Sequence, residues 1–187
     1  MSDVRNFTTL SEGLPPEKVV DALNTHLGLM TRVIMKYGGS IDNFVSDAIV
    51  AVFGVPVTKP DDAARAVACA VEMQNTMAAV NTLNGFKKLP PFEMGIGLNT
   101  GEVVAGNIGS DMRVKYSVIG SPVNVAARLE SLASGGQIFA SAATFAEVRD
   151  VVRTSGNLNV KVKGIKGTVP VHEVVGIGGP FNIHRVG

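Results

Sequence analysis

Two aspartates lie at positions where a carboxylate can hold a metal ion. Asp3 ends the first short segment, and Asp47 lies in a turn between two apolar, β-branched segments. If the first segment pairs beside that hairpin, both carboxylates meet at one end of a sheet. Two carboxylates and substrate phosphates can then hold a pair of Mg²⁺ ions, because this ion keeps several waters and needs few protein ligands. Taken singly, each aspartate is more often an ordinary turn or strand-end residue.

Asn124 and Arg128 form a second candidate pair. They are four residues apart, so they project from the same face of a helix whose other residues are mostly Val, Ala and Leu. An exposed polar helix face gives the same pattern. Beside a phosphate, however, an amide can orient an attacking hydroxyl and a guanidinium can neutralise charge in the transition state. The pattern alone leaves both interpretations open.

Alternating strands and helices are predicted to position these residues. Pro15 and Pro16 begin a helix that Gly38-Gly39 ends, and the turn at Asp47 joins strands at 40–45 and 48–53. Further strands are expected at 92–98, 103–108, 114–119, 137–140, near 158–162 and at 169–175, and further helices at 60–83, 123–132 and 142–148. This alternation, with hairpins mixed in, predicts an α/β (α+β) fold with a mixed, mostly antiparallel sheet and helices mostly on one face. The glycine-rich tail after Gly176 is expected to be loose.

Composition excludes several other classes of protein. The 187 residues suit one domain, and a net charge of +1 gives no bulk electrostatic reason to expect binding to nucleic acid or to an acidic membrane. No apolar run approaches the roughly 18 residues that span a bilayer. The single cysteine, Cys69, cannot form an internal disulfide, which fits a reducing, cytoplasmic location. The three histidines are scattered without metal-ligand spacing, and no Walker A lysine motif is present.

Five segments, in order, resemble the motifs of class III nucleotidyl cyclases, the adenylate and guanylate cyclase catalytic domains. Residues 2–8 (SDVRNFT) resemble the first metal motif, and residues 38–54, ending in SDAIVAVFG, resemble the second. The later blocks are matched by residues 101–110 (GEVVAGNIGS), 116–130 (YSVIGSPVNVAARLE) and 162–164 (VKG). The resemblance implies a catalytic domain over residues 1–176, a flexible tail over 177–187, and a ferredoxin-like βαββαβ core with additional strands.

The resemblance also implies a two-metal reaction. Asp3 and Asp47, assisted by the Val4 carbonyl, would hold two Mg²⁺ (or Mn²⁺) ions. The ribose 3′-oxygen of ATP would attack the α-phosphorus, giving 3′,5′-cyclic AMP and pyrophosphate.

Further residues take roles by the same resemblance. Phe7 and Thr8 would offer backbone groups to the phosphates, and Lys163 would bind the terminal phosphates. Asn124 would orient the ribose, and Arg128 would stabilise the transition state.

In this family the site lies between two chains. One chain would supply the metal aspartates, and the other would supply Asn43, Ser117, Asn124, Arg128 and Lys163. Because this chain carries both sets, the resemblance implies a head-to-tail homodimer with two equivalent sites. We also expect a fused or linked regulatory domain, with this segment in the cytosolic part of a larger sensor protein.

Base recognition is the least defined part of the pattern. Asn43 stands where adenylate cyclases usually have lysine and guanylate cyclases glutamate, and Ser117 occupies the partner position. Asparagine offers both a donor and an acceptor, and serine can act as either. The hydroxyl of Ser117 resembles the threonine of some bacterial adenylate cyclases, which favours ATP. A guanylate or dual-specificity cyclase is the alternative.

Two glycines of the family pattern are replaced. Ser46 precedes the second metal aspartate, and Asn6 lies in the phosphate turn. If these turns need a positive φ, serine is strained there, whereas asparagine tolerates the conformation better. The replacements predict activity that is reduced but not abolished. Ser46 and Asn43 support a second alternative, a catalytically weak cyclase-like domain that binds nucleotide or mediates dimerisation.

Overall fold

The structure is a computed structural model that describes residues 1–161 and 168–186. Lys163, the predicted phosphate ligand, therefore lies outside the described residues. In chain order the elements are β1 (Ser2–Val4), α1 (Phe7–Glu12), α2 (Pro16–Lys36), β2 (Ser40–Val45), β3 (Ala48–Val52), α3 (Asp62–Phe86), β4 (Met94–Leu98), β5 (Val104–Ser110), β6 (Arg113–Ile119), α4 (Ser121–Leu132), β7 (Ile138–Ser141), α5 (Ala142–Val148), β8 (Val152–Lys161), β9 (Thr168–Ile177) and β10 (Ile183–His184).

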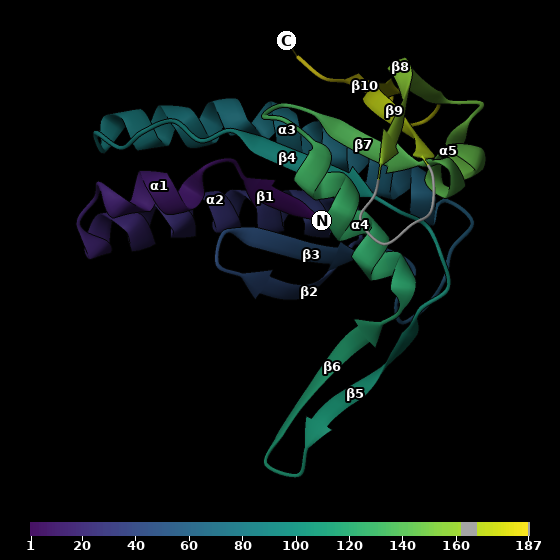
Figure 1. Ribbon diagram of the computed structural model, residues 1–187, viewed down its shortest axis with the longest axis horizontal. Coiled ribbons are helices and arrows are strands. Elements are labelled where there is room, and N and C mark those ends of the chain that lie inside the picture. The colour runs from purple at the N-terminus through teal and green to yellow at the C-terminus, as the bar shows by residue number, and fades with distance from the viewer. Residues whose placement is uncertain (162–167, 187) are drawn as a thin grey trace.

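The first four strands pair antiparallel in the order β4-β1-β3-β2 (Figure 1). α2 lies between β1 and β2 in the chain, and α3 lies between β3 and β4, which is the βαββαβ arrangement expected from the sequence. β7 adds to the sheet in parallel beside β4, and β9 then pairs antiparallel with β7. The expected mixed, mostly antiparallel sheet is confirmed, and β1 lies inside it, between β4 and β3.

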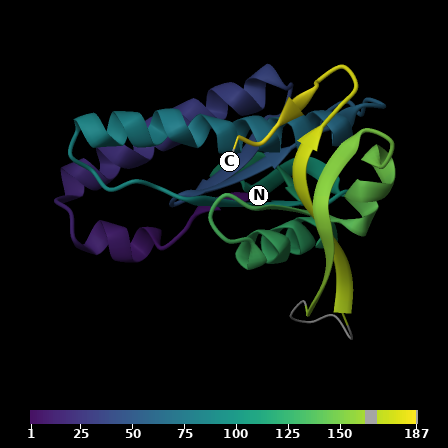
Figure 2. The ribbon, with the colours of Figure 1, turned by 90° about the horizontal axis from the view of Figure 1, so that it is seen from above.

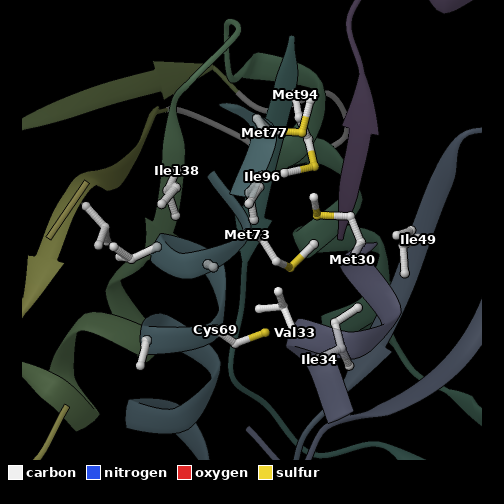
Figure 3. Packing of buried hydrophobic residues seen from close by; sticks show 14 of the residues in the cluster. Met30, Val33, Ile34, Ile49, Cys69, Met73, Met77, Met94, Ile96 and Ile138 are labelled. Atoms are coloured by element: carbon white, nitrogen blue, oxygen red, sulfur yellow. The ribbon is translucent and has the colours of Figure 1, made fainter. Parts of the chain in front are cut away.

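Two long helices, α2 and α3, lie over one face of the sheet and bury the core (Figure 2). Met30, Val33 and Ile34 of α2 recur at helical spacing and meet Cys69 and Met73 of α3 (Figure 3). Burial raises the pKa of the Cys69 thiol to about 12, so this cysteine packs as a small apolar side chain. No helix within the described residues has the length and apolar character that a membrane span requires.

The opposite face of the sheet is covered by α4 (Figure 2). Its backbone lies directly on β4, because a Cβ at Gly97 would come within 2.3 Å of both the Ala126 carbonyl oxygen and the Glu130 nitrogen. Only glycine permits this approach. Gly97 therefore fixes the height of α4, the helix that carries Asn124 and Arg128, above the strand next to β1.

β5 and β6 pair with each other and project from the body as a two-stranded arm (Figure 1). Along the arm Val104, Met112, Val114 and Ile119 are between 58% and 98% exposed. An isolated two-stranded ribbon is marginal in water, and clustered exposed apolar side chains mark an interaction surface. The arm is therefore a candidate contact surface for a second chain.

Two segments near the C-terminus differ from the sequence expectation. β8 begins at Val152, well before the strand expected near 158–162, and pairs with β9 from there to Lys161. The chain after Gly176, expected to be loose, instead continues β9 and returns as β10, which pairs antiparallel with it. Arg185 Nη1 then donates to the Gly136 carbonyl oxygen at 2.7 Å. Hydrogen bonds to distant segments hold this tail in place. The glycine content of the tail does not predict these long-range contacts.

Candidate active site

The two predicted metal aspartates lie on neighbouring parts of the sheet. Asp47 occupies the turn between β2 and β3, and Asp3 lies in β1, which pairs with β3. Asp47 is 8% exposed, and its Oδ2 accepts a hydrogen bond from the Val4 N–H at 3.0 Å. Burial and the adjacent Asp47 carboxyl raise the pKa of Asp3 to about 7. The structure thus brings Asp3, Val4 and Asp47 together, as the sequence predicted.

The donor set of this pair suits a hard divalent cation. A cation bound beside Asp3 would favour the ionised form of its carboxyl, because a nearby positive charge offsets the burial and the Asp47 carboxyl that raise the pKa of Asp3. The oxygens of the two carboxylates, with the carbonyls of β1 nearby, are the ligand type that Mg²⁺ and Mn²⁺ prefer. Among the described residues no third acidic, histidine or cysteine side chain joins them in a metal-binding group. Any cation here would therefore rely on water and substrate oxygens for its other ligands.

The turns that present these residues use left-handed backbone at non-glycine positions. Ser46 and Asn6, the two glycine replacements inferred from the sequence, both have a φ of 57°. This conformation costs a non-glycine residue about 1 kcal/mol or more, and less for asparagine. The strain expected at Ser46 is therefore present, and it lies directly beside Asp47.

Asn6 leads into the short helix α1, whose first two residues are Phe7 and Thr8. The N–H groups of a helix's first turn have no partner inside the helix and point outward along its axis. The Phe7 ring packs edge-on against Phe92, with 5.8 Å between ring centroids, which fixes the start of α1 on the body. These backbone N–H groups are thus positioned just after the strand that carries Asp3.

Arg5 links the carboxylate pair to α4, a connection that the sequence analysis missed. Its Nη2 donates to Asp3 Oδ2 at 3.1 Å and forms an ion pair with Glu130, while its Nη1 donates to the Ala133 carbonyl oxygen at 3.2 Å. The side chains of Arg5 and Glu130 are only 18% and 8% exposed. Gly95 gives room for the guanidinium, because a Cβ there would lie 3.1 Å from Arg5 Cζ. The sequence signal for this contact was spacing. Arg5 follows Asp3 by two residues, and side chains two residues apart in an extended segment point to the same side.

Asn124 and Arg128 both lie on α4, as predicted. Asn124 is exposed and Arg128 is half-buried, and neither side chain makes a hydrogen bond to another described residue. Within one chain they do not meet the two aspartates directly. The connection runs through Glu130, two residues after Arg128, and then through Arg5. A single chain therefore holds both predicted sets but does not assemble them into one site.

The predicted base-reading residues lie on β2 and on the arm. Asn43 is exposed and pairs with Val50 in the β2–β3 hairpin. Ser117 lies on β6, and its hydroxyl donates to Asp42 Oδ1 at 2.6 Å. Asp42, which the sequence analysis passed over, is thus the β2 residue that reaches Ser117. The sequence signal for it was a carboxylate within the hairpin strand, directly before Asn43.

Comparisons with known proteins agree with this geometry. A family model described as "Adenylate and Guanylate cyclase catalytic domain" matches residues 1–176. "Adenylate cyclase 1" of Rhizobium meliloti (strain 1021) is 33% identical over 188 residues, which covers 100% of this chain and 28% of that protein. The chain thus spans under a third of that relative's length.

Two solved structures are similar over nearly the whole chain. The guanylyl cyclase Cya2 has a TM-score of 0.96 and 50% identity, covering 99% of this chain and 94% of that one. The adenylyl cyclase CyaB from P. aeruginosa has a TM-score of 0.89 and 38% identity, covering 93% of this chain and 90% of that one. The similar proteins include cyclases of both base specificities.

Proposed function

Because the chain belongs to the family of adenylate and guanylate cyclase catalytic domains, we propose that it converts ATP to 3′,5′-cyclic AMP and pyrophosphate. The observation that carries this proposal is the carboxylate pair: Asp3 and Asp47 lie side by side, and their proximity helps raise the pKa of Asp3 to about 7. Such a pair is poised to exchange a proton for a divalent cation.

Asp3, Asp47 and the Val4 carbonyl would hold two Mg²⁺ or Mn²⁺ ions. When bound, the metals would supply positive charge that makes the ribose 3′-hydroxyl more acidic and screens the triphosphate. The N–H groups of Phe7 and Thr8 would donate to phosphate oxygens, because they are the outward-pointing donors at the start of α1.

The remaining roles belong to the second half of the site. Asn124 would hold the ribose so that its 3′-oxygen faces the α-phosphorus in line with the leaving pyrophosphate. Arg128 would neutralise the negative charge that grows on the α-phosphoryl oxygens. Lys163 would contact the terminal phosphates.

A complete site requires two chains. Asp3 and Asp47 lie on the sheet, whereas Asn124 and Arg128 lie on α4 and do not meet them within one chain. The exposed apolar arm offers a surface for a partner copy to cover. We therefore propose a head-to-tail homodimer with two equivalent sites, in which each site takes its aspartates from one chain and its α4 residues from the other.

ATP is the proposed substrate, and GTP is the alternative. An adenylate cyclase and a guanylyl cyclase both occur among the similar proteins, so the choice rests on Asn43 and Ser117. The hydroxyl of Ser117 favours ATP. A weakly catalytic domain that binds nucleotide or mediates dimerisation is the second alternative, and the left-handed Ser46 beside Asp47 is the observation in its favour.

We further propose that the domain acts in the cytoplasm, joined to a regulatory domain. The relative in which this domain makes up 28% of the length supports the second part. The single, buried Cys69 is consistent with a reducing compartment.

The proposal is tested by measuring cyclic AMP and cyclic GMP formed from ATP and from GTP, with Mg²⁺ and with Mn²⁺. Asp47→Asn is the informative variant, because it removes the charge but keeps an oxygen that can accept from Val4 N–H. We expect it to lose about 100-fold or more of the activity. Asp150→Asn, at an exposed aspartate in the turn between α5 and β8, is the matched control and should leave activity unchanged. Unchanged product formation in Asp47→Asn would refute the two-metal mechanism.

A further inference from the structure

The contact between Ser117 and Asp42 fixes the direction of a hydrogen bond. The Ser117 hydroxyl and Asp42 Oδ1 are 2.6 Å apart, and the same oxygen accepts from the Val118 N–H at 3.1 Å. The Asp42 side chain is 12% exposed, and its second oxygen lies 3.7 Å from Lys115 Nζ. A carboxylate has no proton to donate, so the serine must donate its only one. Ser117 is then left with lone pairs alone to offer to anything else.

A bulge in β2 explains why Asp42 reaches the arm. The pairing of β2 with β3 shifts register between Ile41 and Asn43, so Asp42 falls out of the ladder. A bulge re-aims the side chain of the extra residue. Ile41 packs against the core while Asp42 meets β6, so the body anchors the carboxylate that holds Ser117. The contact between Asp42 and Ser117 therefore follows from the backbone geometry of β2.

There is space for a ligand beside this contact. A cavity of about 120 Å³ lies at the junction of β2 and β6, lined by Asp42 and Ser117 together with Ser40, Tyr116 and apolar residues. Asn43, the other predicted base-reading residue, follows Asp42 directly in β2.

Adenine and guanine present opposite groups to a hydrogen-bonding partner at the purine 6-position. Adenine carries an amino group there, which donates, whereas guanine carries a carbonyl oxygen, which accepts. A serine hydroxyl that can only accept forms a hydrogen bond with the amino group of adenine. It cannot form one with the guanine oxygen, because both groups then present only lone pairs. Asn43 does not add such a preference, because its amide can turn to offer either a donor or an acceptor.

We propose that Asp42 is a positioning residue that sets base specificity: by taking the Ser117 proton it makes that hydroxyl an obligate acceptor and selects ATP over GTP. This inference rests on the proposed function and deepens it. Asp42 acts on base choice through the Ser117 hydroxyl that it holds.

The test is the ratio of kcat/KM for ATP to kcat/KM for GTP, measured on the same preparation so that any inactive fraction cancels. Asp42→Ala frees the hydroxyl to rotate and donate, and we expect it to lower the ratio about tenfold. Asp42→Asn can keep an oxygen at the Oδ1 position, so it should retain the ratio of the parent chain. If Asp42→Ala lacks turnover, the dissociation constants of ATP and GTP measure the discrimination between the bases in binding, and their ratio should change in the same direction.

A double-mutant cycle separates this role from a merely structural one. In a Ser117→Ala background the hydroxyl is gone, so adding Asp42→Ala should leave the ratio unchanged. An equal fall in both backgrounds, an unchanged ratio in Asp42→Ala alone, or a preference of the parent chain for GTP would overturn the inference. These outcomes are distinct from a failure of the proposed function, in which no cyclic product forms or Asp47→Asn has no effect.

Discussion

Arg5 and Glu130 form an ion pair that joins β1 to α4. β1 carries Asp3, which Arg5 also contacts, and α4 carries Arg128, two residues before Glu130. In the proposed dimer, Asp3 and Arg128 of one chain serve different sites. The ion pair therefore connects the metal half of one site with the transition-state half of the other through a single chain.

Breaking this pair from one side should cost more than removing it. Arg5→Met leaves Glu130 as a buried charge without its partner, and we expect a loss of about 3 kcal/mol in the free energy of unfolding. The double variant Arg5→Met with Glu130→Met removes both charges and should recover most of that loss. Urea unfolding of Arg5→Met, of Glu130→Met alone and of the double variant measures the three free energies. A double variant whose loss equals the sum of the two single losses would show that the pair is not coupled.

Subunit mixing should restore activity between two inactive variants. Asp47→Asn disables one half of the proposed site and Arg128→Ala the other, so each homodimer is inactive. After random exchange of equal amounts, half of the dimers are mixed, and each mixed dimer has one intact site of two. We therefore expect about one quarter of the parent activity.

A matched mixture gives the control for this complementation. Asp3→Asn and Asp47→Asn both alter the half that a single chain supplies, so mixing them forms no intact site. Activity that stays absent in the first mixture, once subunit exchange has been verified, would mean that the site lies within one chain. Recovery in the control mixture would mean that one site takes Asp3 and Asp47 from different chains, which would contradict the proposed division of the site.

Much of the fold could be predicted because local signals agreed with the tertiary structure. The α5 boundaries match the sequence expectation, and the β2–β3 hairpin matches it to within one residue, since Gly38-Gly39 and the β-branched residues of β3 mark the hairpin. Local sequence signals of this kind do not mark β8 and β10. The first half of β8 is polar and largely exposed, and its strand conformation follows from pairing with β9. β10 is held by β9 in the same way.

The residues of the candidate site also fall into predictable and unpredictable groups. Asp3, Asp47 and the α4 pair could be predicted from their residue types and spacing. Arg5, Glu130 and Asp42 did not, because their roles arise from contacts between positions far apart in the chain. The partner of Arg5 is 125 residues away, and that of Asp42 is 75 residues away. Only the packing of α4 and of the arm against the sheet brings these groups together.

Relieving the backbone strain beside Asp47 should stabilise the protein. Ser46 adopts a φ of 57°, which glycine reaches without steric cost. The relief of about 1 to 2 kcal/mol exceeds the entropy that a glycine adds to the unfolded chain, so Ser46→Gly should gain about 0.5 to 1 kcal/mol. Ser131→Gly, within α4, is the control and should destabilise the protein instead. Equal effects at both positions, measured by urea unfolding, would contradict this account.

His26 should make the fold sensitive to mild acid. The ring is fully buried, and neither nitrogen has a hydrogen-bond partner among the described residues. Burial lowers its pKa to about 4, against the opposing influence of Asp47. Because the unfolded state has a pKa near 6.5, it binds more protons than the native state between these values. The stability that neutral His26 preserves is thus fully present above about pH 6.5 and is lost as the pH falls towards 4, by about 3 kcal/mol in all.

The comparison of His26→Leu with the parent chain isolates this contribution. Asp3 has the opposite sign, because its raised pKa means that the native state binds more protons than the unfolded state from about pH 4 to pH 7. Both proteins retain Asp3, so its slope cancels when their unfolding free energies are subtracted.

The parent chain should lose stability relative to His26→Leu as the pH is lowered from 6.5, and the difference in unfolding free energy should be constant above pH 6.5. Urea unfolding between pH 4.5 and 7.5 gives this difference directly. A difference independent of pH would mean that His26 is protonated to the same extent in the native and unfolded states. That result would contradict the prediction.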